Sequence, residues 1–127
     1  MTSPYPLENL PALILNALEV AGQNPPPAGQ ETYLLTLFHG QHITVSLAQI
    51  QGTLKPHYHD THDETIYVLK GRGQALVNGK WEGLSPGTVM YFQGKHVHAS
   101  RAEAGNPLVF LCLFVPGMKE IDRVFVE

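Results

Sequence analysis

The stretch that decides the fold is Gly52-Thr-Leu-Lys-Pro-His57-Tyr-His59-Asp-Thr-His-Asp-Glu64-Thr-Ile-Tyr-Val-Leu-Lys-Gly71. His57 and His59 are two residues apart, so a strand would place both imidazoles on one face. Residues 65–69 are β-branched, aromatic or aliphatic and indicate a second strand, which Glu64 opens after the polar bend 60–63. The stretch therefore predicts two strands that bring two imidazoles and a carboxylate close together.

Short strands continue over most of the chain. They are expected at residues 43–48, 75–77, 80–82, 89–92, 108–115 and 124–126. The dipeptide Asn78-Gly79 is a strong signal for a two-residue hairpin. Residues 108–115 form a continuous apolar run, which suits a strand buried on both faces. Many short strands separated by turns predict an all-β sandwich or barrel.

The amino-terminal segment has a different pattern. Apolar residues recur at spacings of three and four from Leu10 to Leu18, which predicts a short amphipathic helix with Pro11 in its first turn. The sequence Asn-Pro-Pro-Pro-Ala-Gly at 24–29 ends any helix. Residues 1–32 are therefore expected to form a helical or extended arm outside the barrel.

Length and composition restrict the function. The 127 residues correspond to one domain, and the net charge of −3 argues against nucleic acid as the main partner. The most apolar early stretch is too short to span a bilayer, and the first basic residue is Lys55, so neither a membrane span nor a secretory signal is expected. The single Cys112 excludes an intrachain disulfide and, inside an apolar run, is expected to be a core thiol. We expect a cytoplasmic protein.

A second histidine pair, His96 and His98, lies far along the chain from the first, and on a strand its two imidazoles would also share one face. Imidazoles combined with one carboxylate suit iron, manganese, zinc, nickel or copper better than calcium or magnesium. A helical site built from His59, His62 and Asp63 is the rival arrangement. Pro56 and the β-branched run that follows argue against a helix at this position.

The glycine and histidine spacing resembles the first motif of the cupin superfamily. Four residues separate Gly52 from His57, four separate His59 from Glu64, and six separate Glu64 from Gly71, so the first loop is one residue shorter than is usual in that family. The second motif is recognisable from Gly87 to His98. Gln93 stands there where proline is usual, Lys95 stands where glycine is usual, and the usual Asn after His98 is absent.

This resemblance implies a jelly-roll β-barrel with His57, His59, Glu64 and His98 as ligands of one divalent transition metal per chain (Fe, Mn, Zn or Ni). It implies a single cupin domain over residues 1–127, with the barrel core at about 33–126. His62 and Asp63 fall in a bend where the family often has polar residues that do not bind metal. His96 falls at a position that the family does not require, where it could line the pocket.

Two classes of function are compatible with these residues. The first is a metal-dependent enzyme acting on a small oxygen-rich metabolite, either a dioxygenase or a Lewis-acid isomerase, epimerase or lyase. The second is a non-catalytic module that binds a metal or a small sugar-acid-like molecule. Three scattered arginines, Arg72, Arg101 and Arg123, indicate no carboxylate clamp. A homodimer is expected, because small members of the family pair through sheet edges and two-fold pairs are the commonest assembly.

Overall fold

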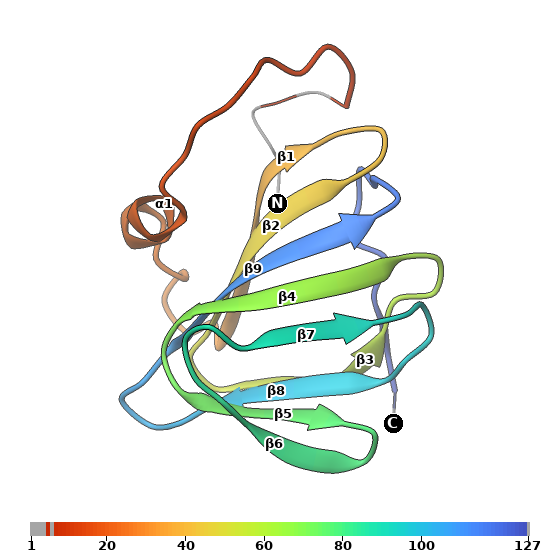
Figure 1. Cartoon of the computed structure of the whole chain (residues 1–127). Coiled ribbons are helices and arrows are strands. Elements are labelled where there is room, and N and C mark those ends of the chain that lie inside the picture. Colours follow the sequence, from red (N-terminus) through yellow and green to blue (C-terminus); the bar gives the residue numbers. More distant parts are fainter. Residues whose placement is uncertain (1–4, 6, 127) are drawn as a thin grey trace.

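The structure is a computed structural model that describes residue 5 and residues 7–126. One helix and ten strands follow one another along these residues (Figure 1). They are α1 (Ala17–Gln23), β1 (Thr32–His39), β2 (Thr44–Ile50), β3 (Thr53–Tyr58), β4 (Asp63–Lys70), β5 (Gly73–Val77), β6 (Lys80–Leu84), β7 (Val89–Phe92), β8 (His98–Ala102), β9 (Leu108–Val115) and β10 (Val124–Phe125).

The strands form two five-stranded sheets in which the neighbouring strands are antiparallel. The first sheet has the order β1-β2-β9-β4-β7, and the second has the order β10-β3-β8-β5-β6. The chain crosses repeatedly from one sheet to the other, and the two sheets form the walls of a barrel (Figure 1). The fold is therefore an all-β double-stranded β-helix, which confirms the predicted jelly roll.

The apolar core fills the space between the two sheets. Strand β9 lies in the middle of the first sheet, between β2 and β4, as its continuous apolar sequence predicted. Its residues Phe110, Cys112 and Phe114 belong to the main cluster of buried residues. Cys112 is 2% exposed, so the expected core thiol is confirmed.

The hairpin between β5 and β6 also confirms its sequence signal. Asn78 and Gly79 both have positive φ angles, 52° and 78°, and they connect the paired residues Val77 and Lys80. A two-residue turn in this conformation matches the twist of the strands on either side.

The described part of the amino-terminal arm, residue 5 and residues 7–31, lies outside the barrel, but its helix is displaced from the predicted position. Residues 10–16 are not helical, and α1 begins at Ala17 because the side chain of Asn16 accepts a hydrogen bond from the Glu19 N–H at 3.1 Å. Ala21, beyond the predicted segment, is the buried residue of α1 and packs in a cluster with Leu37 and Val109 on the outer face of the first sheet. The prediction of a helix over residues 10–18 is therefore wrong.

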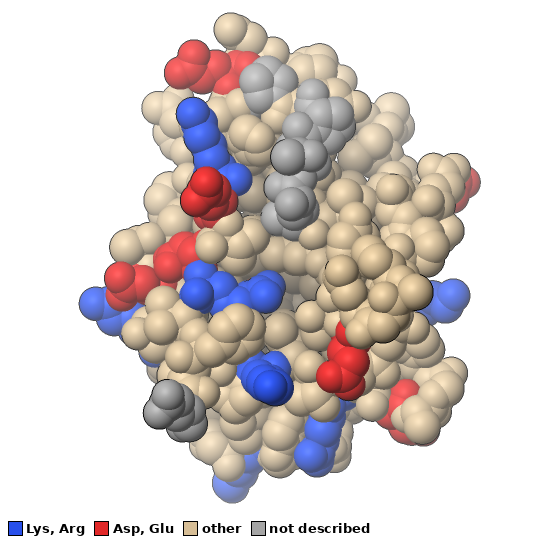
Figure 2. Space-filling model, turned by 180° about the vertical axis from the view of Figure 1, so that it is seen from behind, with Lys and Arg blue, Asp and Glu red and all other residues tan. Residues whose placement is uncertain are grey.

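The far face of the barrel carries mixed charge. Figure 2 shows lysine and arginine side chains interspersed with aspartate and glutamate on this face. The mixture of signs agrees with the small net charge of −3 and gives no continuous basic surface on this face.

Candidate metal centre

Three buried imidazoles meet inside the barrel at one end of the second sheet. His57 on β3 is paired with His98, the first residue of β8, and the centroids of their rings are 4.4 Å apart. His59 follows directly after β3. The three side chains are 2–3% exposed, and their ligand nitrogens lie within 4.8 Å of one another. This is a compact group that could hold a metal ion.

Backbone carbonyls fix the orientation of all three rings. His57 Nδ1 lies 2.7 Å from the carbonyl oxygen of Lys55, His98 Nδ1 lies 2.9 Å from that of His96, and His59 Nδ1 contacts that of Asp122. Because a carbonyl oxygen can only accept, each Nδ1 must carry the proton and donate it. The Nε2 lone pair of each neutral ring is thereby left free to bind a metal.

Glu64 reaches the same group from the opposite sheet. Its Oε1 lies 3.0 Å from His59 Nε2 and 3.1 Å from His98 Nε2, and the residue is 4% exposed. With neutral rings, a carboxylate oxygen would face two nitrogen lone pairs, which is a repulsive arrangement. Either the rings bind protons at Nε2 or a cation lies among these atoms.

Members of the cluster differ in the direction in which their pKa values are shifted. Burial and the neighbouring His98 lower the pKa of His57 to about 4, so its ring is neutral at neutral pH. Burial also opposes the charges of His59 and Glu64, but their mutual hydrogen bond outweighs it, raising the pKa of His59 and lowering that of Glu64. Glu64 is therefore ionised, and the proton shared with His59 is the one that a metal cation would replace.

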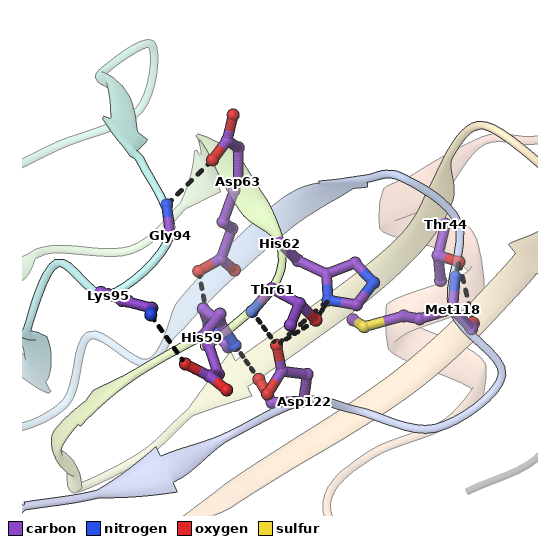
Figure 3. Close-up of polar contacts among 11 residues, drawn as sticks. Thr44, His59, Thr61, His62, Asp63, Gly94, Lys95, Met118 and Asp122 are labelled. Atoms are coloured by element: carbon purple, nitrogen blue, oxygen red, sulfur yellow. Dashed lines mark hydrogen bonds and ion pairs between the residues drawn. The ribbon is translucent and has the colours of Figure 1, made fainter.

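The Asp122 carbonyl that orients His59 is itself held by further contacts, which are drawn in Figure 3. The Asp122 carboxylate accepts from the Thr61 N–H at 2.7 Å and lies 3.1 Å from both the Thr61 hydroxyl and His62 Nδ1. These contacts hold the segment whose Asp122 carbonyl orients His59. Burial tends to raise the pKa of Asp122, but the hydrogen bonds from Thr61 and His62 lower it to about 2.

The other histidines and acids near the motifs have different places. The His62 ring contacts Asp122 and lies outside the compact imidazole group, while Asp63 accepts from the Gly94 N–H and the Tyr91 hydroxyl. The His96 side chain is exposed and contributes only its carbonyl oxygen. The expectation that His96 shares a face with His98 is therefore wrong, because His96 precedes β8 and lies in the loop between β7 and β8.

Arg123, which the sequence places among three scattered arginines and which no motif marks, also lies at this site. Arg123 lines the same small cavity as the three imidazoles and Glu64. The reason is long-range: β10 pairs with β3, with Phe125 opposite His57, and this pairing brings the preceding residues to the cavity. The predicted strand at 124–126 was the one available signal. Only its pairing partner, which the sequence did not reveal, would have placed Arg123 at the site.

The enclosed space in this cluster is small. Its volume is about 20 Å³, enough for one water molecule or a metal ion. Leu34, Ile66 and Phe114 are among the apolar residues around it. The thiol of Cys112 also lines it, and burial together with the charge of Glu64 raises its pKa well above the ordinary value. The thiol is thus protonated and a poor nucleophile.

This barrel, with its buried imidazoles and carboxylate, is typical of one class of protein. Residues 44–114 match the cupin domain family, and the chain belongs to that family. A crystal structure from Klebsiella pneumoniae, of an uncharacterized conserved protein with a double-stranded β-helix domain, covers 92% of this chain and 99% of its own. It superposes with a TM-score of 0.76 at 18% sequence identity.

Two relatives of known activity match parts of the chain. Glucose-6-phosphate isomerase of Thermococcus onnurineus is 34% identical over 67 residues, which are 47% of this chain and 35% of the relative. Quercetin 2,3-dioxygenase of Bacillus subtilis is 32% identical over 82 residues, which are 64% of this chain and 24% of the relative. The chain thus matches about a third and a quarter of these longer enzymes. No helix among the described residues is long and apolar enough to cross a membrane.

Proposed function

We propose that the protein binds one divalent transition metal through His57, His59, Glu64 and His98 and uses it to transform a small oxygen-rich metabolite. The observation that carries this proposal is the orientation of the rings. Backbone carbonyls accept the Nδ1 protons, so the Nε2 atoms of His59 and His98 both face the same Glu64 oxygen, and without the proton that His59 shares with Glu64 their lone pairs would repel that oxygen. A cation resolves the repulsion and satisfies all these groups together.

The residues fit such a metal by type as well as by placement. Three imidazole nitrogens and one carboxylate oxygen form a donor set for iron, manganese, zinc or nickel. A bound metal would supply Lewis acidity, or dioxygen chemistry if it is redox-active. The chain itself would hold the donors in fixed rotamers, and the apolar wall around them would exclude bulk water. The isomerase and dioxygenase relatives support both of these reaction types.

Metal analysis of purified variants tests the ligand set. We expect about one metal per chain in the wild type and a sharp loss in His57→Ala, His59→Ala, His98→Ala and Glu64→Gln. His39→Ala is the control, because His39 lies outside the imidazole group and does not line the cavity. Full metal content in both His57→Ala and His98→Ala would overturn the metal site. Loss in His62→Ala without loss in Glu64→Gln would show that the fourth ligand is wrong.

A second candidate is a module that binds metal or a small sugar-acid-like molecule without catalysis, and the enclosed space, which has room for an ion alone, favours its metal-binding form. Dioxygen uptake with catechols, diketones and thiols, followed by an isomerase and lyase screen with sugar acids, separates the two. Turnover that is lost in His59→Ala supports the enzyme. Tight ligand binding with no turnover supports the binding module.

We also propose that the protein is a homodimer. Strand β10 is a sheet edge, and its Val124 and Phe125 are 38% and 55% exposed. Exposed edges with apolar side chains favour pairing with another chain. Light scattering at micromolar concentration should give about twice the chain mass of 14.0 kDa. A value equal to the chain mass would refute the dimer.

A further inference from the structure

Arg123 lies between two neighbouring spaces. It lines the small cavity that holds the imidazoles, and it also lines a larger open pocket of about 380 Å³. Leu34, Ala48 and Leu54 line both spaces, so the two adjoin across these side chains and Arg123. The larger volume is in the range of pockets for small molecules. The open pocket therefore has the size for a metabolite, and the inner cavity has the size for an ion.

The surroundings of Arg123 satisfy its guanidinium only in part. Its Nε is buried and has no hydrogen-bond partner, and no ion pair joins it to a carboxylate in the described part of the chain. The Phe125 ring, 5.7 Å from the guanidinium carbon, is its aromatic neighbour. A buried guanidinium nitrogen without a hydrogen bond is costly, and an anion bound against the guanidinium would remove that cost.

Glu64 is not the anion bound against Arg123. Burial lowers the pKa of Arg123 and the charge of Glu64 raises it, but the Oε1 of Glu64 is directed to His59 and His98. If a divalent metal binds, as proposed above, the three neutral rings, one carboxylate, the metal and the guanidinium have a combined charge of +2. A site with this surplus attracts an anion rather than a neutral diol or ketone.

We propose that Arg123 binds the carboxylate of a small anionic substrate, which enters through the open pocket and directs its other oxygen atoms toward the metal. This inference rests on the proposed metal site and narrows its substrate class to carboxylic acids. A guanidinium presents paired N–H donors that match the two oxygens of a carboxylate. Arg123 is thus a substrate-binding residue, and its position beside both spaces sets the orientation of the substrate.

Malonate and its neutral counterpart malonamide test the proposal by calorimetric titration of metal-loaded protein. We expect wild type to bind malonate at least about tenfold more tightly than malonamide. Arg123→Gln should lose at least about tenfold in malonate affinity, keep its metal content and leave malonamide affinity unchanged. The malonate affinity of Arg123→Lys should lie between those of wild type and Arg123→Gln. Arg101→Gln is the matched control, because Arg101 stacks on Trp81 and pairs with Gln74 on the exposed side of β8.

The outcomes separate this inference from the proposed function. Wild-type protein that retains no metal overturns the proposed function, and this inference with it. Normal metal content with equal malonate affinity in wild type and Arg123→Gln, or with no malonate binding in wild type, overturns the inference alone. A measurement on wild type guards against a variant that fails to fold. Malonate should protect Arg123, and not Arg101, from phenylglyoxal in peptide mapping, and equal modification with and without malonate would contradict the proposal.

Discussion

Replacing Asp122 by Asn should destabilise the protein although the residue is not a proposed metal ligand. The pKa of its carboxyl is lowered from 3.8 to about 2, because the hydrogen bonds from Thr61 and His62 outweigh the effect of burial. At about 1.4 kcal/mol per pKa unit, this corresponds to about 2.5 kcal/mol. We expect a loss of about 2 kcal/mol at pH 7, because a fifth of the side chain remains exposed and screened by solvent.

The contribution of the Asp122 carboxylate to stability should depend on pH. The folded-state pKa is lower than the unfolded one, so the contribution is fully present above about pH 4 and is lost as the pH falls toward 2. Urea unfolding curves of wild type and Asp122→Asn should therefore differ at pH 7 and converge near pH 2. Asp60→Asn is the control. Asp60 pairs with Lys95 at 3.6 Å with both side chains more than half exposed, so its loss should cost under about 0.5 kcal/mol. An equal cost for the two variants, or a constant difference across the acid range, would refute the reasoning.

Three further outcomes are expected. Lys95→Gly should raise the free energy of unfolding by about 0.5–1 kcal/mol in urea, since Lys95 has a φ of 73° that glycine adopts without strain; a decrease would contradict this. Gly71→Ala should cost roughly 2 kcal/mol or more, because its φ is 93° and a Cβ would lie 2.0 Å from the Pro107 carbonyl oxygen. Gly79→Ala is the control, because Gly79 also has a positive φ but open space around the added Cβ, and it should cost about 1 kcal/mol. Equal costs for Gly71→Ala and Gly79→Ala would show that the contact with Pro107 is unimportant. Metal content should fall as the pH falls below about 6, because protonated imidazoles cannot coordinate, and retention at pH 4 would contradict histidine ligation.

Sequence patterns correctly predicted the features that are formed by residues close together in the chain. The β-branched and aromatic run after Glu64 indicated β4, and the Asn78-Gly79 pair indicated the β5–β6 hairpin. The spacing of His57 and His59 predicted that their side chains would be close. In each case the residues concerned are neighbours along the chain, so dihedral preferences and strand periodicity are sufficient.

The parts that sequence reasoning missed depend on contacts between distant segments. The helix begins later in the chain than predicted because Asn16 caps its amino-terminal end and because Ala21 packs against the outer face of the first sheet. Arg123 reaches the cavity because β10 pairs with β3, more than 60 residues earlier in the chain. Periodicity carries no information on such pairings, so the electrostatic character of the pocket was not predictable.

The polar bend 60–63, which looked like a source of rival ligands, has a different use in the structure. It connects His59 to Glu64, and its side chains, together with the Thr61 N–H and the His59 carbonyl, bind the segments that carry the remaining members of the site. Asp63 accepts from the Gly94 N–H at 2.8 Å, and the Lys95 N–H donates to the His59 carbonyl at 2.7 Å, which ties the loop before His98 to the first motif.

On its other side, the bend holds the carboxy-terminal segment. Thr61 and His62 bind the carboxylate of Asp122, whose carbonyl orients His59 and whose neighbour is Arg123 (Figure 3). The unusual Lys95 is tolerated within this arrangement because its backbone N–H, rather than its side chain, makes the connection to His59. The acids and the histidine of the bend therefore hold the segments that position the proposed ligands.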